Sequence, residues 1–258
     1  MHAQGEESLK QSKSEFWSGE EYDAQYGEDY ANEISFLRDI LTSQQASSLL
    51  DVCCGTGIVT IPLSNEASHV VGIDFSGAMV EFAIEKSATI NNISFYEMDA
   101  TNFDIGTKFD VVSMTGNAFQ AFISDADFLA MLNQIKNHMG NNGTFIFDCR
   151  LPSPEHLEVT SGYEYWSSYI SPKGGKVKVY GWDCVHPHSN DTMLHHIRRD
   201  YESGEQYHSE IELKYRSIDE IVNCLESAGL QLVGHYADWK KTPFTKVSNS
   251  IVGVVRAL

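Results

Sequence analysis

The sequence predicts an α/β protein built on a mostly parallel sheet with helices on both faces. First, short apolar runs alternate with segments of helical periodicity over residues 30–150, as in a buried parallel sheet. Second, this alternation stops after Arg150, where four β-rich runs follow one another with turn residues between them. Third, helix and strand patterns return from Ser217 onward. The chain of 258 residues therefore predicts a Rossmann-like core of seven strands with an inserted antiparallel β lid.

The first part of the core is expected to contain five strands and four helices. Apolar, β-branched runs predict strands at 48–52, 69–73, 92–97, 109–114 and 143–149. Helical spacing of apolar residues predicts helices at about 30–41, 57–65, 77–90 and 126–139. Because helices separate the strands, the strands should lie parallel, and ligands of such sheets bind outside the carboxyl ends of the strands.

The second part of the chain is expected to hold the lid and the last elements of the core. Runs rich in β-branched and aromatic residues predict lid strands at 162–170, 176–186, 192–202 and 206–216. Ser217 followed by Glu220 is a capping-box pattern, which starts a helix that should end at Gly229. Strands at 230–236 and 249–257 complete the sheet. We therefore expect a core of residues 1–150 and 217–258, including an N-terminal cap, and a substrate lid of residues 151–216.

Residues 49–58 have the pattern of a strand, a tight turn and the start of a helix. Gly55 and Gly57 in the turn would let backbone N–H groups approach a ligand. Asp74 closes the next apolar run, at a spacing that suits a carboxylate binding ribose hydroxyls. A dinucleotide-binding turn would carry a third glycine where this chain has Thr60, so the pattern argues against a pyrophosphate ligand.

These residues resemble the motifs of the class I S-adenosylmethionine-dependent methyltransferases of small-molecule type. Four segments carry the resemblance, in the order typical of the family, at Asp51–Gly57, Gly72–Ser76, Glu97–Ala100 and Phe109–Asn117. Cys53 stands where the first motif of the family has its first glycine. The resemblance implies a Rossmann-like fold and S-adenosyl-L-methionine as cofactor.

The resemblance also implies which residues contact the cofactor. The expected contacts are Asp51, Gly55 and Gly57 for its amino-acid part, Asp74 for its ribose, Phe75, Asp99 and Ala100 for its adenine, Thr115 and Gly116 near its methyl group, Met79 on the helix after the second motif, and Tyr22 and Tyr26 above the site. Most of these residues follow the predicted ends of parallel strands, so they can meet at one edge of the sheet.

The candidate catalytic residues, expected near the methyl acceptor, are Asn117, Tyr22 and His196. Residues 116–121 resemble a segment of glycine-type amine N-methyltransferases, but Ala121 stands where that family has a histidine, so no catalytic base is implied there. His195 and His196 in the lid should point to opposite faces of their strand, so at most one of them can face the cavity. Further candidates for substrate contact are Arg198, Tyr180 and Trp182. No spacing of histidines, cysteines and acids predicts a metal site.

Composition restricts the partners and the compartment. With 18 basic and 36 acidic residues, the formal net charge is −18, which opposes binding to nucleic acid or to an anionic membrane. The five cysteines are odd in number and lie mostly in apolar segments, which favours reduced thiols in the cytoplasm. Residues 1–14 are expected to form a disordered leader without a signal peptide. The strands of the lid are compatible with a homodimer.

The predicted function is methyl transfer from S-adenosylmethionine to a small molecule, by in-line displacement at an aligned and desolvated acceptor. An amine nitrogen is slightly favoured over a hydroxyl oxygen as the acceptor. One alternative is a methyltransferase for RNA or protein, which the net charge and the lack of an Asn-Pro-Pro-Tyr type motif oppose. Another is a module that binds S-adenosylmethionine without turnover, which the Gly116–Asn117 edge and the full lid oppose.

Overall fold

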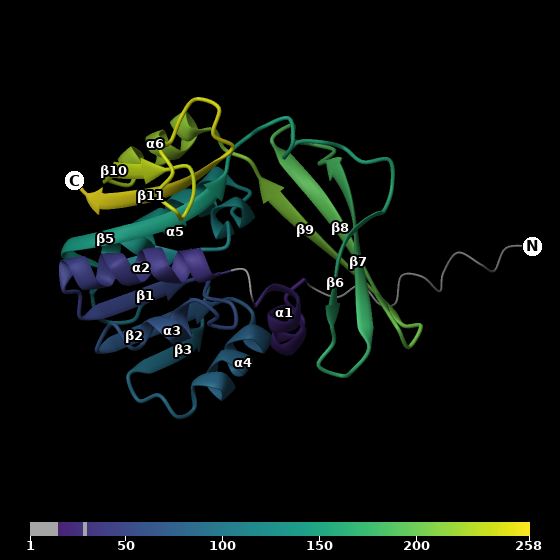
Figure 1. Ribbon diagram of the computed structural model, residues 1–258. Helices are drawn as coiled ribbons and strands as arrows, with labels where there is room; N and C mark the ends of the chain where they lie inside the picture. The colour runs from purple at the N-terminus through teal and green to yellow at the C-terminus, as the bar shows by residue number, and fades with distance from the viewer. Residues whose placement is uncertain (1–14, 28–29) are drawn as a thin grey trace, which may run out of the picture.

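The computed structural model describes residues 15–27 and 30–258, whose strands form two sheets (Figure 1). The larger sheet has the strand order β10-β11-β5-β4-β1-β2-β3. Its strands are β1 (Ser48–Val52), β2 (His69–Asp74), β3 (Ile93–Glu97), β4 (Phe109–Met114), β5 (Met139–Arg150), β10 (Leu230–Tyr236) and β11 (Ser250–Ala257). The leader expected at residues 1–14 lies outside the described residues.

The larger sheet is parallel except at one edge. β1 pairs in parallel with β2 and β4, β2 with β3, and β4 with β5. β11 runs antiparallel to both of its neighbours, β5 and β10. This arrangement confirms the predicted α/β fold with a mostly parallel sheet of seven strands.

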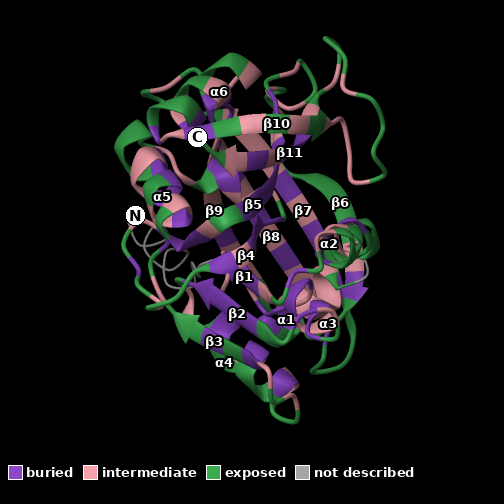
Figure 2. Ribbon diagram, turned by 90° about the vertical axis from the view of Figure 1, so that its left-hand side faces the viewer, coloured by how far each residue is buried: buried purple, intermediate pink, exposed green. Residues whose placement is uncertain are grey.

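Helices cover both faces of this sheet. One face carries α2 (Ala31–Gln44), α3 (Thr60–Leu63) and α4 (Gly77–Ser87), and the other carries α5 (Asp125–His138) and α6 (Ile218–Ser227). The neighbouring residues Leu49 and Leu50 of β1 belong to the two different apolar clusters, one on each face. The central strands are therefore buried on both sides, as Figure 2 shows, and their sequences are mostly apolar.

Three local features differ from the predictions. The helix expected at 57–65 is reduced to α3, because Gly57 has a φ of +74° and cannot be helical. β5 begins at Met139, directly after α5, and is therefore longer than predicted. An additional helix, α1 (Gly19–Tyr26), has Ser18 as its N-cap. The Ser18 side chain accepts a hydrogen bond from the Glu21 N–H.

The second sheet is antiparallel, with its strands in chain order. It consists of β6 (Glu164–Ile170), β7 (Lys176–Val185), β8 (Thr192–Tyr201) and β9 (Gln206–Lys214). On one face, Tyr169, Val177, Val179 and Ile197 form an apolar cluster that also contacts Ala24 of α1. We call this the inner face, and its opposite the outer face. Figure 1 shows α1 between the two sheets, so the N-terminal helix joins them.

Candidate functional site

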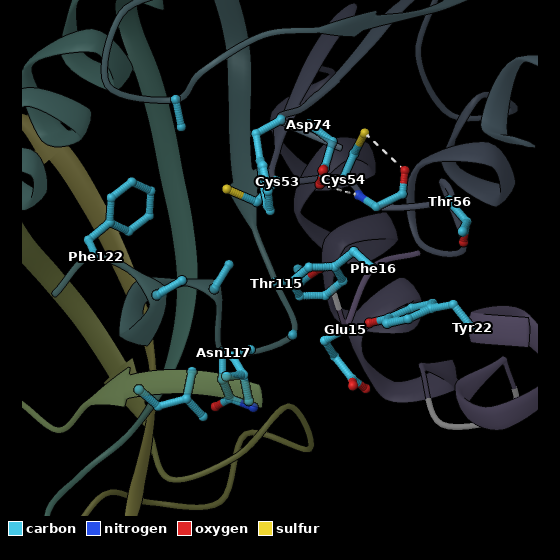
Figure 3. Close-up of a pocket in the computed structure, with 18 of the residues that line it drawn as sticks. Glu15, Phe16, Tyr22, Cys53, Cys54, Thr56, Asp74, Thr115, Asn117 and Phe122 are labelled. Carbon is cyan, nitrogen blue, oxygen red and sulfur yellow. Dashed lines mark hydrogen bonds between the residues drawn. The ribbon is translucent and has the colours of Figure 1, made fainter. Parts of the chain in front are cut away.

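A cavity of about 540 Å³ lies at the carboxyl ends of the parallel strands (Figure 3). Its core wall is formed by Cys53, Cys54 and Gly55 after β1, Asp74 and Phe75 after β2, Asp99 and Ala100 after β3, and Thr115, Gly116 and Asn117 after β4. The remaining walls include Glu15, Phe16, Tyr22 and Tyr30 from the N-terminal part and Glu210, Ile211, Glu212 and Leu213 from β9. The cavity thus lies where the larger sheet, the second sheet and the N-terminal part meet.

Most of the predicted site residues line this cavity. They are Tyr22, Gly55, Asp74, Phe75, Asp99, Ala100, Thr115, Gly116 and Asn117. Five other predicted contacts, namely Tyr26, Asp51, Gly57, Met79 and His196, are not part of its lining. Figure 3 shows Asn117 and Phe122 on one side of the cavity and Glu15 and Tyr22 on the other.

Asp74 is held at the cavity wall by backbone groups. Its Oδ2 accepts a hydrogen bond of 2.9 Å from the Gly55 N–H, and its Oδ1 accepts one of 2.9 Å from the Ser76 N–H. The side chain is almost fully buried, and this burial raises its pKa above the ordinary value. The Asp74 carboxylate is therefore fixed in orientation, with little water around it. Ser76 directly precedes α4, but its hydroxyl does not cap that helix and donates to the Phe16 carbonyl at 3.0 Å.

Asp51 and Gly57 shape the loop after β1 from behind the cavity wall. Asp51 is buried and accepts hydrogen bonds from the Thr60 hydroxyl at 2.5 Å and the Ser113 hydroxyl at 2.7 Å. Burial raises its pKa to about 6. A Cβ added to Gly57 would lie 2.8 Å from the ring of Phe95, so this glycine is required by packing. Both residues therefore stabilise the conformation of the loop after β1.

The loop itself turns through three residues with positive φ, Cys53, Gly55 and Gly57. Gly55 has a φ of +54°, and an added Cβ would meet nothing within 4 Å, so its backbone is open to the cavity. Cys53 has a φ of +59°, a conformation that costs about 1–2 kcal/mol for residues with a Cβ. Glycine is the residue that adopts this conformation freely, which explains why the first motif of the resembling family has glycine there.

The loop after β4 has the same property. Gly116 and Asn117 have φ values of +71° and +59°. The Asn117 N–H donates a hydrogen bond of 2.9 Å to Oδ1 of Asp148, a buried residue of β5. Burial raises the pKa of Asp148 to about 6, and its Oδ2 accepts a long hydrogen bond of 3.4 Å from the indole of Trp239. Asp148 therefore fixes the Asn117 turn at the edge of the cavity.

Three tyrosines from the N-terminal part gather over the site. The hydroxyls of Tyr22 and Tyr30 lie 3.2 Å apart, and both residues line the cavity. The Tyr26 ring lies 4.8 Å from that of Tyr22, but its hydroxyl donates to Glu15 at 3.4 Å. Tyr26 thus supports Tyr22 and Glu15 from behind. Tyr30 was not among the predicted site residues, because its position before α2 did not distinguish it from a packing residue.

His196 lies on the outer face of the second sheet. Its ring stacks on Trp182, with the centroids 4.6 Å apart, and its Nδ1 lies 2.8 Å from Oε2 of Glu210. Arg198 and Tyr180 share that face, with the guanidinium 4.5 Å from the ring centroid. None of these four aromatic or cationic residues lines the cavity. Sequence analysis missed Glu210 and its neighbour Glu212 on β9, since charged residues on a strand are usually solvated.

Residues 15–27 and 30–258 contain no group of three or more histidine, cysteine or acidic side chains that could hold a metal ion. No helix within these ranges is both long enough and apolar enough to cross a membrane.

Residues 49–143 match a family described as a methyltransferase domain. This range is therefore similar to a methyltransferase domain. It contains the loops after β1, β2, β3 and β4, which form the core wall of the cavity. The four segments that carried the resemblance in the sequence all begin within it.

Known proteins are similar to this chain in sequence over about half of its length and in fold over nearly all of it. A demethylmenaquinone methyltransferase from Staphylococcus saprophyticus is 30% identical over 138 residues, which cover 52% of this chain and 57% of that protein. This chain thus spans little more than half of that relative. An S-adenosylmethionine-dependent methyltransferase from Clostridium acetobutylicum has a TM-score of 0.79 at 19% identity, over 92% of this chain and 96% of that one. A sugar N-methyltransferase from Streptoalloteichus has a TM-score of 0.72 at 22% identity, over 98% of each chain. These two structures establish the fold over nearly the whole chain.

Proposed function

We propose that the protein transfers a methyl group from S-adenosylmethionine to the nitrogen of a small cationic amine. The methyltransferase domain and the fold support the methyl-transfer part of this proposal. The acidic lining of the cavity supports the amine part, and it is the observation on which the choice of acceptor depends. The five cysteines are free, which agrees with a reducing compartment, and we infer the cytoplasm.

The residues at the core wall fit S-adenosylmethionine. The buried Asp74 carboxylate can accept hydrogen bonds from two ribose hydroxyls, because each oxygen has acceptor capacity beyond its one backbone N–H. Phe75, Asp99 and Ala100 line the part of the cavity where adenine would bind. The open backbone at Gly55 leaves room for the amino-acid part. When bound, this cofactor supplies a methyl carbon attached to a positively charged sulfur.

The residues around the donor would promote transfer mainly by alignment and by excluding water. Phe16 and Tyr22 cover the cavity from the N-terminal side, and their rings lie 6.1 Å apart. Thr115 and Asn117 form the opposite edge. An acceptor held between these two walls is desolvated and kept close to the methyl carbon. This arrangement lowers the entropic part of the activation free energy, compared with a chance encounter of the two molecules in solution.

The charge of the lining favours a cationic acceptor. Five acidic residues belong to the lining, Glu15, Asp74, Asp99, Glu210 and Glu212. The Glu15 carboxylate is paired with Arg199, and the Glu210 carboxylate lies beside His196 on the outer face, so Asp74 and Asp99 contribute most of the negative charge that faces the cavity. No lysine, arginine or histidine belongs to the lining within the described residues. Such a field concentrates cations and repels phosphates. An acceptor linked to a nucleoside diphosphate is therefore disfavoured.

The β9 side of the cavity also indicates the shape of the acceptor. The side chains of Ile211 and Leu213 project from the inner face of β9, and Phe122 and Ile123 line the same side, while Glu210 and Glu212 alternate with them along the strand and belong to the rim of the cavity. This mixture suits an ammonium head group attached to an apolar body. We therefore expect an alkyl or arylalkyl amine rather than a polyhydroxylated or phosphorylated compound.

A charge series of ligands with the same body tests this proposal. The full chain, loaded with S-adenosylhomocysteine, is titrated calorimetrically with 2-phenylethylamine, 2-phenylethanol and phenylacetate. We expect the cation to bind about tenfold more tightly than the alcohol, and the anion most weakly. Equal affinity for the three compounds would contradict the amine assignment. Failure of the chain to bind S-adenosylmethionine would contradict the methyl-transfer function itself.

A further inference from the structure

Tyr30 lines the cavity from a position directly before α2. It lies in the same wall as Tyr22 of α1, whose ring extends toward the edge formed by Thr115 and Asn117 (Figure 3). Both tyrosine side chains are half-buried, so each is covered by protein on one side and faces the cavity on the other. A molecule bound in the cavity can therefore contact Tyr30 directly.

The Tyr30 hydroxyl lies beside the loop after β4. A Cβ added to Gly116 would lie 3.3 Å from the hydroxyl oxygen, so this oxygen is close to the Gly116 backbone. Thr115 and Asn117, on either side of Gly116, form the edge at which the proposed acceptor would meet the methyl group. The hydroxyl is thus located where the N-terminal wall of the cavity meets this edge of the core.

The hydroxyls of Tyr22 and Tyr30 form a pair that uses only part of its hydrogen-bonding capacity. The two oxygens lie 3.2 Å apart, and within residues 15–27 and 30–258 neither of them forms another hydrogen bond. A hydroxyl has one O–H donor and two acceptor lone pairs. The bond between the two tyrosines uses one O–H and one lone pair, so the remaining lone pairs can accept hydrogen bonds from a bound molecule.

Both hydroxyls are expected to stay protonated at neutral pH. Burial raises the pKa of Tyr22 and of Tyr30 above the ordinary value of 10.0. A neutral hydroxyl takes no proton from an ammonium group, but its oxygen accepts hydrogen bonds from N–H groups. The tyrosine pair is therefore suited to orienting an amine, while the carboxylates of Asp74 and Asp99 attract its charge.

We propose that Tyr30 binds the methyl acceptor by accepting a hydrogen bond from an N–H group of the amine. This inference rests on the proposed function. The contact holds the nitrogen beside Gly116, and the Tyr30 O–H remains able to donate to Tyr22.

The proton balance of the reaction does not involve Tyr30. The bound ammonium first loses one proton to solvent, which leaves a neutral amine with a nitrogen lone pair. This lone pair forms the new N–C bond while the C–S bond breaks, and the electrons of that bond stay on sulfur. The methylated ammonium then leaves, and Tyr30 keeps its own proton throughout.

Two cations that differ in their N–H groups test this contact. The full chain, loaded with S-adenosylhomocysteine, is titrated calorimetrically with 2-phenylethylamine and with N,N,N-trimethyl-2-phenylethylammonium. Both ligands carry one positive charge near neutral pH, but only the first has N–H groups. We expect Tyr30→Phe to weaken the binding of 2-phenylethylamine about tenfold, because the variant removes the hydrogen-bond acceptor. The affinity for the trimethyl cation should stay within about twofold of wild type.

Tyr236→Phe is the matched control. Tyr236 packs on the same apolar cluster as Tyr30 and against Phe36 of α2, but it is not part of the cavity lining. This variant should bind both cations as wild type does. A general disturbance of the cavity by Tyr30→Phe would weaken both cations equally, so the difference between the two ligands measures the N–H contact itself.

Steady-state kinetics with 2-phenylethylamine separate this inference from the proposed function. Tyr30→Phe should lower kcat/KM for the amine about tenfold without changing KM for S-adenosylmethionine. A kcat/KM within about twofold of wild type, or an equal loss of affinity for both cations, would overturn the inference while the methyl-transfer function stands. If the wild type transfers no methyl group and Tyr30→Phe loses affinity for the primary amine alone, the proposed reaction fails and the Tyr30 contact stands. If the wild type binds neither cation, both fail.

Discussion

Asn117 combines a backbone role and a side-chain role at one residue. Its φ of +59° lies in the left-handed region, which asparagine tolerates better than alanine does. Its N–H is fixed by Asp148, and its side chain lines the cavity. The two roles can be separated because glycine retains the backbone conformation and removes only the side chain.

We expect Asn117→Gly to keep the free energy of unfolding within about 1 kcal/mol of wild type and to lower kcat about tenfold, because only the acceptor contact is lost. Asn117→Ala should lower kcat similarly and also lower the free energy of unfolding by about 1 kcal/mol, because alanine is strained at this φ. Urea denaturation and steady-state kinetics of the two variants provide both quantities. A wild-type kcat in Asn117→Gly would show that the side chain does not align the acceptor.

At the scale of elements, the N-terminal part is tied to the second sheet by buried polar contacts. Arg199 of β8 makes two hydrogen bonds to the Glu15 carboxylate, of 2.5 and 3.0 Å, and both side chains are more than nine-tenths buried. Glu21 of α1 accepts hydrogen bonds of 2.7 Å from the hydroxyls of Tyr169 and Ser171. On the core side, Asp23 of α1 contacts Lys86 of α4. One wall of the cavity therefore depends on these contacts.

We expect Glu15→Ala to lower the free energy of unfolding by about 3 kcal/mol, because it leaves the Arg199 charge buried without a partner. The double variant Glu15→Ala, Arg199→Met should lose less than the sum of the two single variants. The exposed pair Arg38 and Glu66 is the control, and Glu66→Ala should cost less than about 1 kcal/mol. Chemical denaturation of the wild type, the two single variants, the double variant and Glu66→Ala gives the free energy of unfolding of each. Additive losses in the double variant would mean that the two side chains are not coupled.

At the scale of the whole molecule, stability should depend on pH through two buried carboxyl groups. Burial raises the pKa of Asp51 and of Asp148 to about 6, from an ordinary value of 3.8. The folded chain therefore binds these two protons more tightly than the unfolded chain does. It follows that the free energy of unfolding falls as pH rises from about 4 to about 6 and is no longer changed by these groups above that range. The net charge of −18 acts in the same direction, since protonation reduces self-repulsion.

We expect each of the two carboxyls to contribute up to about 3 kcal/mol to this fall. Asp148→Asn should flatten the pH dependence between about pH 4.5 and pH 6.5, because the variant has no group that titrates at this position. Asp238→Asn is the control, since hydrogen bonds from Thr242 lower the pKa of this exposed carboxyl and place its titration below the range. Urea denaturation at a series of pH values measures the effect. An unchanged slope in Asp148→Asn would contradict the burial argument.

The sequence by itself determined the core and its cofactor edge. β1 and β4 begin and end where the apolar runs predicted, and the capping box at Ser217 starts α6. Local patterns suffice there, because strands buried on both faces are mostly apolar and ligand loops of such sheets follow the strand ends. Asp74 was predicted at the site from this logic, and it lines the cavity.

Only the tertiary structure decided the acceptor side of the site. The sequence showed that His195 and His196 face opposite ways, but the choice of His196 for the cavity was not supported, since the packing of the second sheet on α1 turns His195 inward. Glu15 meets Arg199 from a position 184 residues away. Such pairings depend on how the two sheets pack against each other. Local periodicity carries no information about this packing, because either face of an antiparallel sheet can be the buried one.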